Sequence, residues 1–365
     1  MTLHSEIFEQ PRILNDLLES SWGLIRDIAQ QIKAHDVDYV FLAARGTSDN
    51  AGRYAQYLWG ADNGLPIALA TPSLFTLYET PPRLQRALVV GVSQSGKSPD
   101  IVRVLDEARR QGCPTLAITN APDSDLNRAA DFQIDIKAGH EGAVAATKSY
   151  TAELMAIAML SAAMKDSNEA YEVLKRVPGW AEEMLQFDAA IARAAERFRY
   201  MTQCVVLGRG FNYSTAFEWS LKLKELTYVA AEPYSSADFQ HGPIAVVDQG
   251  YPVLAVAPQG RVYSDLLALL KKLNEERKAE LLVISNRSEA LNLARSPLRL
   301  PEMPESVTPI VSIVPAQLFS YHLTREKGYN TEAPRGLRKV TEHAKNQKFP
   351  FFWGIFNQFL SKRKG

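Results

Sequence analysis

The stretch Val89-Val90-Gly91-Val92-Ser93-Gln94-Ser95-Gly96-Lys97-Ser98-Pro99-Asp100 joins three kinds of local structure. Its apolar start is typical of a buried strand, and the serines around Gly96 are typical of a turn. Beyond Pro99, apolar residues recur at helical spacing, and Ser98 stands at the expected N-cap. The sequence therefore predicts a strand, a hydroxyl-rich turn and a helix in direct succession.

This turn has the chemistry of an anion site. Free backbone N–H groups and the positive end of the helix dipole attract a phosphate, and Ser93, Ser95 and Ser98 add three hydroxyls. Lys97 adds a positive charge. The ordinary alternative is a turn whose serines only cap the helix, which is common for an isolated motif of this kind. The rest of the chain decides between the two.

The composition excludes several classes of partner. The chain has 365 residues, 46% of them hydrophobic, which is enough for two ordinary domains with large cores. Lysine plus arginine equals aspartate plus glutamate, so we expect a small-molecule partner and neither nucleic acid nor an anionic membrane. The first residues do not resemble a signal peptide and no run is long enough to span a bilayer, so we expect a cytoplasmic protein. Cys113 and Cys204 adjoin apolar runs and should be buried thiols, and we expect no metal site and no cofactor.

The first half of the chain alternates predicted strands and helices, which favours an α/β fold with a doubly wound parallel sheet. The strands are expected at residues 38–44, 66–70, 87–92, 114–119 and 132–136. Thr47 and Ser48 follow the first of them, and Ser93, Gln94 and Ser95 follow the third. Because the carboxyl ends of parallel strands share one edge, both polar turns should lie together at a ligand site.

Three helical segments surround this unit. Residues 7–34, with Pro11 near the start and an apolar side that includes Leu24, predict an arm that packs on the body or on a second subunit. Residues 149–163 are apolar nearly all round and should be buried. The charged residues 165–199, which we expect to break near Pro178, should connect two domains.

The second half repeats the first. Gly208-Arg209-Gly210 matches Ala44-Arg45-Gly46, and residues 251–286 parallel residues 87–120, at an offset of about 165 residues. We infer a duplicated α/β domain. In the second copy Ser93-Gln94-Ser95-Gly96 becomes Ala257-Pro258-Gln259-Gly260, which has no hydroxyl, so only the first copy should hold phosphate.

The second copy carries ionisable groups instead. Glu218, Lys222 and Glu225 stand at i,i+4 and i,i+3 spacing on one face of a predicted helix. A solvated charged face is the ordinary interpretation, but apolar residues interleave so densely that some of these charges should lie near apolar surface. His241-Gly242-Pro243 follows, and a histidine beside Gly-Pro is usually a loop residue.

Taken together and in order, these motifs resemble the sugar isomerase (SIS) family, which includes the isomerase half of glucosamine-6-phosphate synthase and stand-alone aminosugar-phosphate deaminases and isomerases. The resemblance covers residues 7–342. The matching motifs are Arg45-Gly46-Thr47-Ser48, Ser93-Gln94-Ser95-Gly96 with Ser98, Glu141 with Val144-Ala145-Ala146-Thr147-Lys148, Leu207-Gly208-Arg209-Gly210, Lys222-Leu223-Lys224-Glu225, His241-Gly242-Pro243 and Pro334-Arg335-Gly336-Leu337-Arg338-Lys339.

The resemblance implies two tandem SIS domains, at residues 35–164 and 200–328, with a helical arm at 1–34, a connector at 165–199 and a catalytic loop at 329–342. It also implies a homodimer with shared active sites and assigns a role to each matched residue. The residues that would hold the 6-phosphate of a sugar are Ser93, Gln94, Ser95 and Ser98, and those around the sugar would be Thr47, Ser48, Val144 and Glu141. In catalysis, Glu225 would be the base and His241 would open the ring. Lys339 would lie near the carbonyl, and Lys222 would be a further catalytic residue.

Two features depart from the family pattern. The synthase carries an amino-terminal glutaminase domain with a nucleophilic cysteine, and the chain begins directly with the isomerase part, so we expect no glutamine hydrolysis. The aromatic and basic residues 343–365 lie beyond the expected end of the family and have no functional account.

The expected chemistry is proton transfer between C1 and C2 of an open-chain sugar, with a carboxylate as base, an imidazole for ring opening and a lysine at the carbonyl. Without its own ammonia source the domain should favour release, so the first interpretation is an aminosugar-6-phosphate deaminase that converts glucosamine 6-phosphate to fructose 6-phosphate and ammonia. An aldose–ketose isomerase or a fructosamine-phosphate deglycase would use the same residues. A non-catalytic sugar-phosphate sensor is the alternative from another class.

Overall fold

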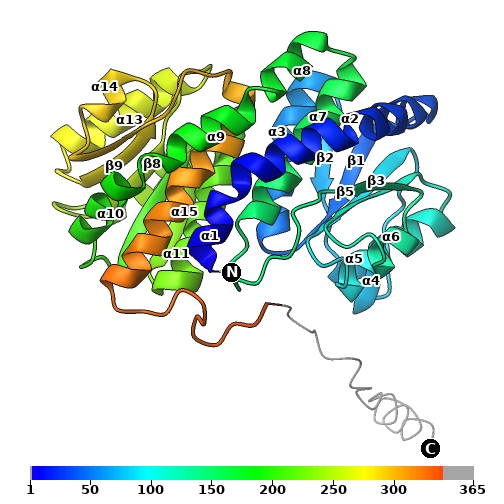
Figure 1. Ribbon diagram of the computed structural model, residues 1–365, viewed down its shortest axis with the longest axis horizontal. Coiled ribbons are helices and arrows are strands. Elements are labelled where there is room, and N and C mark those ends of the chain that lie inside the picture. Colours follow the sequence, from blue (N-terminus) through cyan, green and yellow to red (C-terminus); the bar gives the residue numbers. More distant parts are fainter. Residues whose placement is uncertain (1, 340–365) are drawn as a thin grey trace, which may run out of the picture.

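The computed structural model describes residues 2–339, which form two parallel five-stranded sheets flanked by helices (Figure 1). The first sheet has the order β2-β1-β3-β4-β5 and every pairing in it is parallel. Its strands are β1 (Tyr39–Ala43), β2 (Ile67–Leu69), β3 (Ala87–Ser93), β4 (Thr115–Thr119) and β5 (Phe132–Asp135). The strand order reverses between β1 and β3, and at such a point the carboxyl ends of the strands leave a crevice for a ligand.

The second sheet has the order β10-β9-β8-β6-β7, which is the same order when its strands are counted from β6. Its strands are β6 (Gln203–Gly208), β7 (Ala230–Ser235), β8 (Pro252–Val256), β9 (Glu280–Ser285) and β10 (Ser296–Arg299). The two copies therefore share one topology, and the predicted α/β fold with a duplicated, doubly wound parallel sheet is confirmed.

Each sheet has its own helices. Those of the first domain are α3 (Thr47–Asn63), α4 (Ser73–Thr76), α5 (Pro99–Arg110), α6 (Asp125–Arg128) and α7 (Lys148–Lys165); those of the second are α11 (Tyr213–Thr227), α12 (Ser236–Gln240), α13 (Tyr263–Glu275), α14 (Ser288–Leu291) and α15 (Thr308–Glu326). Short 3₁₀ turns lie at Gly210–Asn212, Pro243–Val246 and Glu305–Val307. All seven residues of β3 are buried, as expected for a parallel strand covered on both faces.

The middle of the molecule is a helical layer between the two sheets (Figure 1). Helix α7 is buried at every residue except Lys165, as its sequence predicts, and it packs against α2 and α3. Helix α11 contacts both α15 and α3, and one continuous apolar core includes residues of both sheets. This packing fixes the distance between the β1 and β3 edge of the first domain and the charged helix α11 of the second.

The amino-terminal arm differs from its prediction, because it forms two helices, α1 (Leu3–Phe8) and α2 (Gln10–Ala34), rather than one. Pro11 lies in the first turn of α2. Proline has no N–H to continue the hydrogen bonding of α1, whereas the first turn of α2 needs no N–H donor at that position. Leu24 was expected on the buried side, but it is 53% exposed.

The connector breaks close to Pro178, as predicted, and has a second break that was not predicted. It consists of α8 (Asn168–Leu174), α9 (Val177–Leu185) and α10 (Asp188–Arg197), with breaks at residues 175–176 and 186–187. Pro178 lies in the first turn of α9, so it begins this helix and does not interrupt one. A backbone N–H in the first turn would have no partner within the helix, so the missing N–H of proline costs nothing there.

None of the helices within residues 2–339 is both long and apolar enough to cross a membrane. The unexplained segment at 343–365 and the last three residues of the expected catalytic loop lie outside the described residues.

Candidate active site

A cavity of about 920 Å³ lies at the carboxyl edge of the first sheet. Its walls come from six parts of the chain: the turn after β1, the turn between β3 and α5, the start of α6, the segment before α7, helix α11 of the second domain, and the segment that ends at Lys339. The lining residues include Thr47, Ser48, Ser93, Gln94, Ser95, Ser98, Val144, Lys222, Glu225 and Lys339. The structure thus brings together ten of the twelve residues that the sequence nominated.

The turn between β3 and α5 forms one wall. Ser93 is the last residue of β3, and Ser98 occupies the N-cap of α5, but its side chain makes no capping hydrogen bond. Gly96 has φ +60, and a Cβ there would lie 2.1 Å from Ser124 Oγ, so only glycine fits this turn. Ser98 is therefore the N-cap, as predicted, but its hydroxyl makes no capping bond, and the residue lines the cavity.

A second wall is the start of α3. The Thr47 hydroxyl donates a hydrogen bond to Glu218 Oε1 at 3.1 Å and accepts one from Lys222 Nζ at 3.2 Å. The Ser48 hydroxyl donates to Glu153 Oε1 at 2.8 Å. These bonds hold both hydroxyls in fixed positions: Glu218 and Glu153 do not line the cavity, whereas Lys222 does.

Helix α11 places an ammonium between two carboxylates. Lys222 Nζ lies 2.6 Å from Glu225 Oε2 and 3.3 Å from Glu218 Oε1. The Glu218 side chain is fully buried, whereas that of Glu225 is 24% exposed and lines the cavity. The sequence predicted that some charges of this face lie near apolar surface, and Glu218 is the fully buried carboxylate because it bonds Thr47 and Asn50 of α3.

The protonation of this group follows from burial and pairing. Burial alone would lower the pKa of Lys222, but the carboxylates of Glu218 and Glu225 outweigh it and raise that pKa above its ordinary value. Burial raises the pKa of Glu218, and Lys222 offsets part of this effect. Burial also raises the pKa of Glu153 to about 8. Lys222 therefore stays an ammonium, and Glu153 is largely protonated at neutral pH.

Lys339 reaches the cavity from the carboxyl-terminal segment. Its Nζ lies 2.8 Å from Glu141 Oε2, and Glu141 also accepts hydrogen bonds from the backbone N–H groups of Thr147 and Ser149, at 3.0 and 3.1 Å. Burial alone would raise the pKa of Glu141, but Lys339 and these bonds lower it. Glu141 was expected among the sugar-binding residues; it does not line the cavity and instead holds Lys339 from behind.

His241, like Glu141, is a predicted site residue that does not line the cavity. It is the C-cap of the short helix α12, and its side chain is exposed. Within residues 2–339 of a single chain, the ring-opening imidazole is therefore not part of the site.

The corresponding turn of the second domain is occupied by the protein itself. Glu305 Oε2 accepts a hydrogen bond from the backbone N–H of Arg261 at 2.8 Å. A Cβ on Gly260 would lie 2.0 Å from the Glu305 carboxyl carbon, so the carboxylate fits closely against this turn. An internal anion thus lies where the first copy presents its serines.

Sequence reasoning missed the buried groups behind the site. Glu153 and Asn50 do not face the cavity, but Glu153 bonds Ser48, and the Asn50 side-chain amide donates to Glu218 Oε2 at 2.8 Å. Glu153 carried a usable signal, because it is the one carboxylate in the otherwise apolar run that forms α7. Asn50 carried none.

Known proteins share these sequence and fold features. The SIS domain family model matches residues 35–163 and 200–326. The chain is 33% identical over 337 residues to glutamine–fructose-6-phosphate aminotransferase [isomerizing] of Aquifex aeolicus, which covers 92% of the chain and 56% of that relative. A relative of the same name from Legionella pneumophila is 35% identical over 347 residues, which covers 92% of the chain and 57% of the relative. The chain thus spans about half the length of the curated relatives it matches.

Solved structures agree. The C-terminal domain of glucosamine-fructose-6-phosphate aminotransferase from Francisella tularensis has a TM-score of 0.84 at 28% identity, over 91% of this chain and 98% of that one. Because the SIS model matches one segment on each sheet and most of the described chain, the protein belongs to the SIS domain family, with two repeats homologous to the isomerase half of glutamine–fructose-6-phosphate aminotransferase.

Proposed function

We propose that this protein binds a sugar 6-phosphate at the turn between β3 and α5 and transfers a proton between C1 and C2 of the open-chain sugar. The cavity itself supports this proposal, because its lining combines a serine-rich helix start with the Glu225 carboxylate and Lys339. The serines and the start of α5 suit the phosphate, and the partly exposed carboxylate suits the base. Fructose 6-phosphate appears in the names of the curated relatives.

Each charged group then has one task. Glu225 takes the proton from one carbon and returns it to the other, and its partner Lys222 holds the carboxylate in place. The hydroxyls of Thr47 and Ser48, whose protons are donated to Glu218 and Glu153, accept hydrogen bonds from hydroxyls of the sugar. Lys339, paired with Glu141, stabilises negative charge on the carbonyl oxygen as an ammonium rather than attacking it as a free amine.

The reaction that we favour is deamination of an aminosugar 6-phosphate. Glu225 removes the C2 proton of open-chain glucosamine 6-phosphate and returns it at C1, which leaves an imine at C2. Water adds to this imine and ammonia leaves, which gives fructose 6-phosphate. The fold of this chain is also that of a glucosamine-6-phosphate deaminase from Thermotoga maritima, with a TM-score of 0.76 at 20% identity, and this likeness concerns the fold alone.

The test is to supply the full chain with glucosamine 6-phosphate, glucose 6-phosphate and a fructosamine 6-phosphate, and to assay ammonia and ketose phosphate. The proposal predicts ammonia and fructose 6-phosphate from glucosamine 6-phosphate. Isomerised glucose 6-phosphate without ammonia would replace the deaminase by an aldose–ketose isomerase, and release of amine from the adduct would indicate a deglycase. Tight binding with no turnover of any substrate would indicate a sensor.

A further inference from the structure

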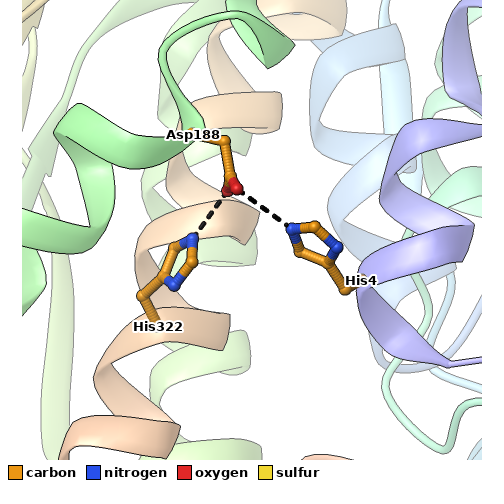
Figure 2. A group of neighbouring side chains, drawn as sticks. All are labelled: His4, Asp188 and His322. Atoms are coloured by element: carbon orange, nitrogen blue, oxygen red, sulfur yellow. Dashed lines mark hydrogen bonds and ion pairs between the residues drawn. The ribbon is translucent and has the colours of Figure 1, made fainter.

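Away from the cavity, three side chains from distant parts of the chain converge (Figure 2). His4 lies on α1, Asp188 is the first residue of α10, and His322 lies on α15. His4 Nε2 lies 3.2 Å from Asp188 Oδ2, and His322 Nε2 lies 2.6 Å from Asp188 Oδ1. The ligand atoms of the three residues all lie within 4.8 Å of one another.

We propose that His4, Asp188 and His322 bind a divalent transition-metal ion such as Zn²⁺, with water in the remaining coordination position. Imidazole nitrogen and carboxylate oxygen bind Zn²⁺ at about 2.0–2.2 Å, and three protein ligands with one open position are a common arrangement. Neighbouring ligand atoms of such a tetrahedron lie about 3.3 Å apart. Both imidazoles point at the Asp188 carboxylate, which lies between them, and the three ligand atoms lie within 4.8 Å of one another. Metal binding would therefore replace the two hydrogen bonds, with the carboxylate turning aside to admit the ion.

The surroundings hold the two imidazoles in place. The His4 ring packs against the rings of Phe8 and Tyr321, with centroids 4.6 and 4.8 Å away, and Tyr321 also packs against His322 at 5.1 Å. The side chains of His4, Asp188 and His322 are 32%, 28% and 12% exposed. An ion can therefore enter from solvent and yet meet ligands whose rotamers are already restricted, which lowers the entropy lost on binding.

An ion at this site would fasten α1, and α1 contacts two segments that reach the cavity. The backbone N–H of Leu3 lies 3.1 Å from both carboxylate oxygens of Glu332, in the segment that leads to Lys339. Glu6 Oε1 accepts hydrogen bonds from the backbone N–H groups of Gly142 and Ala143, next to Val144. We therefore expect the metal to stabilise the packing of α1 against these two segments, and so the fold as a whole.

Calorimetry with zinc chloride on the full chain, after removal of bound metal with a chelator and dialysis, tests the proposal without any sugar. The wild type should bind one Zn²⁺ per chain. His4→Ala and Asp188→Asn should each weaken binding by more than roughly 100-fold, because even residues that only support a metal ligand are worth 10–100-fold. His35→Ala removes an exposed histidine elsewhere on the surface and should leave binding unchanged.

Two further measurements guard against misfolded variants. Circular dichroism should show that His4→Ala is folded, and zinc should raise the melting temperature of the wild type but not of this variant. Cobalt(II) should give the intense visible bands of a tetrahedral site only when His4 is present. Zinc binding by His4→Ala at the wild-type affinity, or no stoichiometric binding by the wild type, would overturn the proposal and leave a hydrogen-bonded His–Asp–His cluster.

Discussion

Lys222 sets the electrostatic balance of the candidate active site. Its side chain is 1% exposed, and its Nζ is shared between Glu225 at 2.6 Å and Glu218 at 3.3 Å. A buried ammonium with two carboxylate partners is costly to disrupt, because the loss of one charge leaves another unpaired. Glu225 is thus held from within the protein while its other side faces the cavity.

The phosphate turn gives a prediction for a single hydroxyl. Ser95→Ala should weaken the binding of a sugar 6-phosphate by about fivefold or more, since a neutral hydrogen bond is worth about 1 kcal/mol and a charge-assisted bond more. Calorimetry with fructose 6-phosphate measures the change. Gln259→Ala, in the corresponding turn of the second domain, is the control and should bind normally. Unchanged affinity in Ser95→Ala, or a wild-type preference for unphosphorylated sugar, would contradict the phosphate site.

Glu153 gives a prediction about pH. Its pKa in the folded protein is raised to about 8 by burial, whereas the unfolded chain should show an ordinary glutamate pKa near 4.5. A raised acid pKa means that the stabilising effect of the neutral form is fully present below pH 4.5 and is lost as the pH rises through about 8. Glu153→Gln should therefore gain stability relative to the wild type between these values, by on the order of 1 kcal/mol or more.

Calorimetric melting temperatures of the wild type and Glu153→Gln at pH 5 and pH 9 check this prediction. Surface variant Glu172→Gln serves as the control, since Glu172 forms an exposed pair with Lys175. A difference between wild type and Glu153→Gln that does not change with pH would show that Glu153 is not held neutral.

At the residue scale, spacing and resemblance identified the groups that face the cavity, but not those behind them. Glu218 and Lys222 could be found because helical spacing alone places them on one face. Their partners Asn50 and Thr47 come from another domain, and a single sequence does not say which helix faces which. The His4, Asp188 and His322 cluster was invisible for the same reason, since 184 residues separate His4 from Asp188.

Among the elements, the turn after β8 explains the difference between the two copies. The carboxylate of Glu305 bonds Arg261 N–H at 2.8 Å, in the place where the first copy offers serine hydroxyls. We infer that this internal anion stabilises the turn and takes the place that an external anion would need. Phosphate binding is therefore proposed for the first domain alone, while the second supplies α11.

Glu305→Ala tests this division of roles. The variant should lose on the order of 1–3 kcal/mol of stability, because it removes a hydrogen bond to a charged acceptor. Its affinity for fructose 6-phosphate should equal that of the wild type, because the first copy is untouched. Thermal unfolding and calorimetry measure the two quantities. A fall in sugar-phosphate affinity as large as that of Ser95→Ala would contradict the assignment of one site per chain.

Strands were easier to predict than helix ends. Each predicted strand of the first sheet overlaps one in the structure, because continuous apolar runs between polar turns identify buried parallel strands. Pro11 was correctly predicted near the start of a helix and Pro178 near a break between helices, but a proline can mark either the end of one helix or the start of the next. Apolar periodicity continues across the junction of α1 and α2, so the break before Pro11 was not predicted, whereas a break near Pro178 was.

On the scale of the whole molecule, the site depends on the packing of two domains. Thr47 of the first domain hydrogen-bonds Glu218 and Lys222 of the second. Lys339, in the segment that follows the second domain, also lines the cavity. Duplication was detectable from the constant offset between motifs, but the relative placement of the copies depends on how α3, α7 and α11 pack.

His241 motivates a prediction about assembly, because it is exposed and outside the cavity of its own chain. We expect a homodimer in which His241 of one chain completes the site of the other. Mixing His241→Ala chains with Glu225→Gln chains should then restore part of the activity, since one site of each hybrid would be intact. If hybrids of folded, dimeric variants stay inactive, the shared site is wrong.

The central claim is that Glu225 moves the proton between C1 and C2. Glu225→Gln keeps the shape of the side chain but removes the base, so turnover should fall on the order of 100-fold or more while sugar-phosphate binding persists. If Glu225 were only a structural partner of the buried Lys222, Glu225→Gln would lower stability but leave the turnover of the folded protein unchanged. Nuclear magnetic resonance in deuterated water measures exchange at C1 and C2 directly, alongside ammonia release. We expect exchange by the wild type and almost none by Glu225→Gln; exchange by the variant at the wild-type rate would show that Glu225 is not the base.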